Sequence, residues 1–125
     1  MKINLYEIDK VAVLEPAGKI MGGEGVILLE EKLFSLLGRG EKKVVVDLGK
    51  TYWVSSPAVS VLLNHNIRFR EIGGSLKLAN LTNKIEEIIT ITRLVSFFEV
   101  YDNLDEALNS FKEQKDTRKI LESVQ

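Results

Sequence analysis

Two residue types that often carry out chemistry are scarce in this chain of 125 residues, which contains no cysteine and a single histidine, His65. Thiol chemistry, disulfides and zinc–thiolate sites are therefore excluded, and histidine pairs cannot form. Gly49-Lys50-Thr51 follows a valine-rich run, but a phosphate-binding loop needs an earlier glycine at the position that Val44 occupies. We interpret these three residues as a polar turn after a strand.

The other candidate groups also have structural explanations. The carboxylate pairs Glu30-Glu31 and Glu86-Glu87 are adjacent in sequence, so on helices they point apart and cannot act as acid–base couples. The glycine-rich segment 21–26 lacks the three-glycine spacing of a dinucleotide site. His65 lies on the apolar face of a predicted helix, which is typical of a core histidine. We therefore expect no catalytic residues, no metal or cofactor site, and no enzymatic activity.

Strands are indicated at several places along the chain. Alternating apolar residues predict a strand over residues 2–7, with Ile3 and Leu5 inward, and the β-branched run 11–14 completes a hairpin. The unbroken run Val44-Val45-Val46 predicts a central strand, from Val44 to Asp47, that is buried on both faces. Trp53-Val54 extends the strand system, and further strands are expected at 75–81 and 97–101.

Helical spacing of apolar residues predicts four helices. They cover residues 26–37, 57–72, 83–92 and 105–111, with Ser56 as the N-cap and Pro57 as the first residue of the second helix. Thr82 or Asn83 would cap the third helix, and Asp102 or Asn103 the last. The order β-β-α-β-α-β-α-β-α predicts one α/β domain with a mixed sheet of four to five strands.

Composition limits the class of protein. The chain is 45% hydrophobic and 28% charged, and 17 Lys+Arg against 18 Asp+Glu give a net charge of -1. That balance argues against nucleic-acid binding, and no secretory or membrane-spanning segment is visible, so we expect a cytoplasmic protein. We expect one domain over residues 1–112 and a charged C-terminal extension over 113–125 that is helical or partly disordered.

Three segments together resemble a known family. The segments 44–48 and 54–63 and the pair Gly73-Gly74 are similar to the anti-sigma factor antagonists, whose fold is the STAS domain. Residues 13–20, 76–81, 85–94 and 97–107 fit the rest of the pattern, so the resemblance extends over residues 2–111. Ser55 stands where the family has aspartate, and Pro57, Ala58 and Ser60 replace the family's next serine or alanine and two glycines.

The resemblance implies a function and a site. It implies a bacterial regulator of transcription that binds an anti-sigma factor and thereby releases a sigma factor. The resemblance also implies that the partner is itself a serine kinase with an ATP-binding domain that phosphorylates Ser56, with Ser55 as the competing acceptor. A phosphate at this helix start would meet free amides and the positive end of the helix.

The remaining expectations concern the partner surface. Val59, Leu63 and Ile67 form a second apolar line on the helix, which either packs under a neighbouring helix or is partly exposed. If it is exposed, the partner-binding residues are Ser56, Val59, Ser60, Leu63 and Ile67. We expect a monomer or weak dimer. The alternative function is a STAS-type binding module without phosphorylation, in a transporter-associated or signalling assembly.

Overall fold

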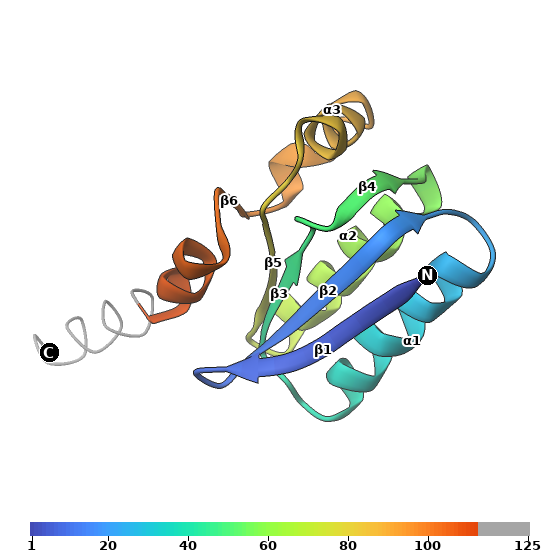
Figure 1. The fold of residues 1–125 in the computed structure, drawn as a ribbon. Coiled ribbons are helices and arrows are strands. Elements are labelled where there is room, and N and C mark those ends of the chain that lie inside the picture. Colours follow the sequence, from blue (N-terminus) through green and yellow to red (C-terminus); the bar gives the residue numbers. More distant parts are fainter. Residues whose placement is uncertain (113–125) are drawn as a thin grey trace, which may run out of the picture.

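A mixed sheet of six strands forms the centre of the computed structural model of this chain, which describes residues 1–112 (Figure 1). Strand β1 (Lys2–Ile8) pairs antiparallel with β2 (Val11–Ile20). Asp9 and Lys10 join them with φ angles of 52° and 67°, the left-handed conformation of a two-residue hairpin turn. The extension predicted over 113–125 lies outside the described residues.

Parallel strands follow the hairpin across the sheet. Strand β3 (Lys43–Asp47) pairs with β2 on one side and β5 (Ser75–Ala79) on the other, and β6 (Val100–Tyr101) completes the order β1-β2-β3-β5-β6. This arrangement confirms that the valine-rich strand is central. The last strand is shorter than expected, because Val95–Phe97 forms a turn of 3₁₀-helix before it.

A sixth strand explains why the sheet exceeds the predicted four to five. Strand β4 (Thr51–Val54) pairs in parallel with the second half of β2. The first half of β2 pairs with β3 at Ala12–Leu14, and the ten residues of β2 leave its end, from Gly18 to Ile20, for β4. The Trp53-Val54 extension is therefore confirmed as part of a separate short strand.

Helices begin and end close to the predicted positions. They are α1 (Glu24–Gly38), α2 (Ser56–Glu71), α3 (Asn83–Ile91) and a helix over residues 104–112. Thr82 caps α3 by accepting a hydrogen bond from the Ile85 amide at 3.3 Å, and Asn103 caps the last helix by accepting one from Glu106 at 2.8 Å. None of the helices within residues 1–112 combines the length and apolar character that crossing a bilayer requires.

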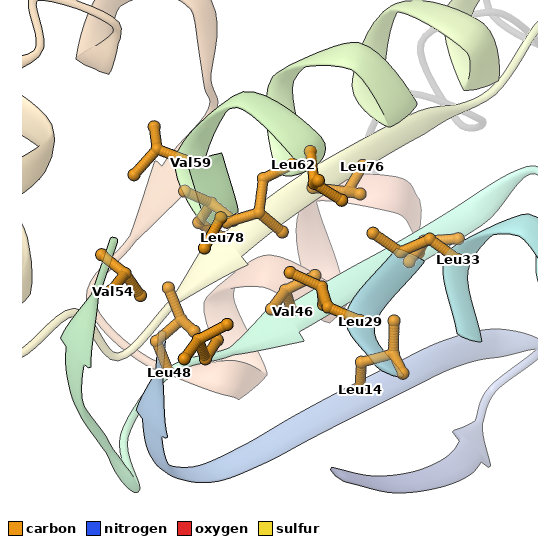
Figure 2. Packing of buried hydrophobic residues seen from close by; sticks show 14 of the residues in the cluster. Leu14, Leu29, Leu33, Val46, Leu48, Val54, Val59, Leu62, Leu76 and Leu78 are labelled. Carbon is orange, nitrogen blue, oxygen red and sulfur yellow. The ribbon is translucent and has the colours of Figure 1, made fainter. Parts of the chain in front are cut away.

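Two hydrophobic clusters cover the two faces of the sheet. On the face under α1 and α2, Val44 and Val46 of β3 join a large cluster that includes Leu29, Leu33 and Leu62 of the helices (Figure 2). On the opposite face Val45 packs in a smaller cluster with residues of the last helix, namely Ala107, Leu108 and Phe111. The unbroken valine run is thus explained by burial on both faces.

The outer strand β1 departs from its predicted burial. Ile3 is buried as expected, but Leu5 is 38% exposed. β1 is the edge strand with β2 as its single neighbour, so the helices cover it incompletely. Sequence alternation correctly predicted the strand but overestimated how much of its inner face is covered.

Candidate functional site

The start of α2 differs by one residue from the prediction. Ser55, not Ser56, is the N-cap: its backbone is extended, with φ −81° and ψ 162°, and its hydroxyl accepts a hydrogen bond from the Ala58 amide at 3.3 Å. Ser56 and Pro57 are the first two helical residues. The helix begins one residue early because proline is also tolerated at the second position, where the missing N–H would have had no helical partner.

This shift changes which backbone amides are available at the helix start. Pro57 has no N–H, the Ala58 amide donates to the Ser55 hydroxyl, and the Val59 amide donates to the Ser55 carbonyl at 3.1 Å. The expectation of free amides following Ser56 is therefore wrong. An anion on the Ser56 side chain would be stabilised by the positive end of the helix dipole but would accept few hydrogen bonds from backbone amides.

Two strand ends hold the start of α2 in place. The Ser55 amide donates to the carbonyl of Ile20, the last residue of β2, at 2.9 Å, and β4 ends at Val54. Figure 1 shows the ends of β2 and β4 meeting the first turn of α2. Ser55 is half-buried in this junction, whereas Ser56 is exposed. The hydroxyl of Ser56 makes no hydrogen bond within the described part of the chain.

The outward face of α2 contains four of the five residues predicted to bind a partner. Ser56 and Ser60 are exposed, Ile67 is 47% exposed, and Leu63 is half-buried against the larger cluster. Val59 is fully buried, and Figure 2 shows it among the core side chains. Val59 is therefore a core residue and cannot contact a partner directly.

Two polar side chains on the inner faces of α2 fix the helix to its neighbours. Buried Asn66 accepts from the Leu76 amide of β5 at 3.0 Å and donates to the Phe97 carbonyl at 3.1 Å. His65 Nε2 lies 3.4 Å from Glu30 Oε1 of α1, while its buried Nδ1 has no hydrogen-bond partner among residues 1–112. Burial lowers the pKa of the His65 imidazole, and the contact with Glu30 partly opposes that effect.

Gly49 and Lys50 form a turn between β3 and β4, as the sequence predicts, and Thr51 begins β4. Asp47 Oδ1 accepts hydrogen bonds from the Gly49 amide and from Asn80 Nδ2, both at 3.0 Å, and Thr51 Oγ1 donates to the Pro16 carbonyl at 2.8 Å. These contacts connect the turn to the ends of β2 and β5. The polar groups of the turn therefore serve the fold.

Two aromatic residues beside α2 were not predicted as site residues. Tyr52 and Trp53, on β4, are 57% and 37% exposed. Alternation along a strand would have turned one of them inward, so no sequence signal distinguished them.

Comparisons with known proteins give a consistent picture. A Bordetella bronchiseptica protein named as an anti-sigma factor antagonist, BtrV, is 29% identical over 112 residues, which cover 90% of this chain and 96% of that protein. A Thermotoga maritima crystal structure, also described as an anti-sigma factor antagonist, matches with a TM-score of 0.80 at 23% identity. That match covers 86% of this chain and 92% of the other.

The fold extends to a protein solved in a modified state. Bacillus SpoIIAA in its phosphorylated form matches with a TM-score of 0.69 at 13% identity, over 88% of this chain and 99% of that chain. The family model for the STAS domain matches residues 2–107, which span the whole sheet and helices α1, α2 and α3. This chain therefore belongs to the STAS domain family, as its strand and helix motifs indicate.

Proposed function

We propose that this protein is an anti-sigma factor antagonist, which binds an anti-sigma factor and so frees the sigma factor that this factor holds. The observation that carries the proposal is the near full-length match to a relative named for this role, at 96% of the relative's length, within a shared fold. Fold alone would not suffice, because the same fold can host different functions.

The partner would bind on the outward face of α2. Ser56, Ser60 and Ile67 are exposed there, and half-buried Leu63 lies between them along the helix. An exposed isoleucine on the same helix face as two small serines gives a protein partner both apolar area and room to approach closely. Val59 supports this surface from below as part of the core.

Phosphorylation of Ser56 would switch the binding off. Its hydroxyl is exposed and makes no hydrogen bond within residues 1–112, so a kinase can reach it without opening the fold. A phosphate adds a charge of about −2. Since Pro57 offers no N–H and the next two amides are already bonded, that charge stays directed at the surface where the partner would have to desolvate it.

Ser55 is the weaker candidate for modification. It is half-buried, and its hydroxyl caps α2, so a kinase would have to break the cap to reach it. The test is incubation with purified ATP-binding anti-sigma factors of the source genome and ATP, followed by mass spectrometry. We expect Ser56→Ala to remove the label and Ser55→Ala to retain it; the reverse result would move the switch to Ser55.

Two matched substitutions of isoleucine test the outward face of α2, which we call the docking face. Ile67→Glu should weaken binding of the anti-sigma factor at least about tenfold, because it places an unpaired charge in the interface. Ile27→Glu makes the same change on α1, where Ile27 is 58% exposed, and should bind like the wild type. Equal affinities for both variants would exclude the outward face of α2, and a wild type that binds no anti-sigma factor would favour the module without phosphorylation.

A further inference from the structure

An irregularity in β4 turns two successive aromatic rings toward solvent. Gly18 of β2 is paired with Thr51 and the next residue, Lys19, with Trp53, so Tyr52 has no partner opposite it. This is a β-bulge, which interrupts the alternation of side chains along a strand. As a result Thr51 and Val54 are buried while Tyr52 and Trp53 are both exposed.

A lysine lies over each of these rings. Lys19 Nζ of β2 is 5.8 Å from the centroid of the Tyr52 ring, and Lys84 Nζ of α3 is 5.4 Å from that of Trp53. Neither lysine forms an ion pair with a carboxylate among residues 1–112. Exposed cation–π contacts of this kind are weak, so both charges remain available to a partner.

These groups border the start of α2. Val54 follows Trp53 and precedes the Ser55 cap, and the Ser55 amide is bonded to Ile20, which separates Lys19 from exposed Met21. We name Met21, Tyr52 and Trp53, with Lys19 and Lys84, the β4 aromatic surface. It is continuous along the chain with the Ser56 end of the docking face described above.

We propose that the β4 aromatic surface is a second part of the same docking site, and that it receives an acidic edge of the anti-sigma factor. This inference rests on the proposed function and adds the chemistry of the partner. Tyrosine and tryptophan are the residue types that most often anchor interfaces, because they add large rigid area at low entropic cost. The two lysines beside them, which form no ion pair within residues 1–112, fit carboxylates that surround an apolar pocket on the partner.

The chain permits a direct test, because Trp53 is its single tryptophan. The emission of Trp53 should shift to shorter wavelength when the purified anti-sigma factor is added, as water is excluded from the ring. Calorimetry should then show Tyr52→Ala and Lys19→Glu/Lys84→Glu each weakening binding by about tenfold or more, with a wild-type affinity that falls as salt is raised. Thermal unfolding establishes that the variants are folded.

Matched controls separate this surface from general effects. Phe34→Ala removes an exposed ring on α1, and Lys42→Glu reverses an exposed charge before β3, so both should bind like the wild type. If the wild type binds but the β4 variants bind equally well, this inference fails while the proposed function stands. If the wild type binds no anti-sigma factor, both fail. A shift of Trp53 emission with protein concentration alone would assign the surface to self-association and overturn the inference.

Discussion

Ser55 and Ser56 are adjacent but differ in what their hydroxyl groups do. Ser55 closes the first turn of α2, whereas the Ser56 hydroxyl is exposed. The sequence Ser-Ser-Pro is compatible with either serine as the cap, because proline fits the first or the second helical position. The choice of Ser55 as the cap therefore depends on the hydrogen bond between its amide and the Ile20 carbonyl at the end of β2, which sequence patterns do not reveal.

The cap assignment predicts unequal effects of two alanine substitutions. Ser55→Ala should lower the free energy of unfolding by about 0.5–2 kcal/mol, because the Ala58 amide loses its acceptor. Ser56→Ala should change it by less than about 0.5 kcal/mol, since an exposed hydroxyl without a bond is removed. Urea denaturation followed by circular dichroism measures both values. A larger loss of unfolding free energy for Ser56→Ala than for Ser55→Ala would show that Ser56 is the cap.

His65 predicts a pH dependence of stability in the mildly acidic range. Burial lowers the pKa of its imidazole in the folded state, so the unfolded chain binds the proton more readily. Stability should therefore fall as pH drops through about 6.5, the ordinary value, and be regained above it. Glu30 and Arg68 are the charged groups that act on this imidazole, and Glu30 partly offsets the effect of burial.

The control for this prediction removes the titrating group. No other histidine is present, so few groups with ordinary pKa values change charge between pH 7.5 and 5.5. His65→Met should flatten the dependence of unfolding free energy on pH in that window, whatever its effect on absolute stability. An identical slope in the variant would show that His65 is not the responsible group.

Among the elements, the sequence predicted the strand that is buried on both faces most clearly. Val44, Val45 and Val46 predicted the central strand, because a strand covered on one face would alternate with polar residues. The caps Thr82 and Asn103 were each one of two predicted candidates, since such side chains act on amides three residues ahead. Both signals are local, so they can be recognised without knowing the tertiary structure.

The bulge in β4 illustrates what local patterns cannot supply. Gly18 and Lys19 are adjacent on β2, but their partners on β4, Thr51 and Trp53, are separated by Tyr52. Tyr52 therefore has no partner on β2. That mismatch depends on two segments far apart in sequence. The same holds for Val59. Its position on the helix was compatible with burial and with exposure, and it is buried because of elements packed around it that the sequence pattern does not reveal.

Because β3 is buried and β1 is an edge strand, introducing an aspartate should destabilise the fold far more on β3 than on β1. Val45→Asp should destabilise the fold by about 3 kcal/mol or more, because it buries a carboxylate in the smaller cluster, where the opposite residue Lys77 can offset only part of the desolvation cost. Leu5→Asp makes the same kind of change on the edge strand, where Leu5 is 38% exposed, and should cost much less. Soluble yield and urea midpoints test this; similar losses at both sites would contradict a central β3.

For the molecule as a whole, strand direction determines where the candidate site lies. The parallel strands β2 and β4 end on the side of the sheet where α2 begins (Figure 1). The pairing of β2 with β4 and the hydrogen bond from the Ser55 amide to the Ile20 carbonyl therefore bring the bulge, Ser56 and the start of the proposed docking face to the same end of the sheet. The large cluster under α1 and α2 and the smaller one under the last helix hold the sheet between them. A partner could therefore bind at this edge without opening either core.

Release of a sigma factor from its anti-sigma factor tests the central claim most directly. A preformed complex of fluorescently labelled sigma factor with the anti-sigma factor is titrated with this protein, and the labelled sigma factor is followed by anisotropy. Wild type and Ser56→Ala should release it, and Ser56→Glu should need about 5- to 150-fold more protein, corresponding to roughly 1–3 kcal/mol. Failure of the wild type to release any sigma factor, or equal release by Ser56→Glu, would contradict the account.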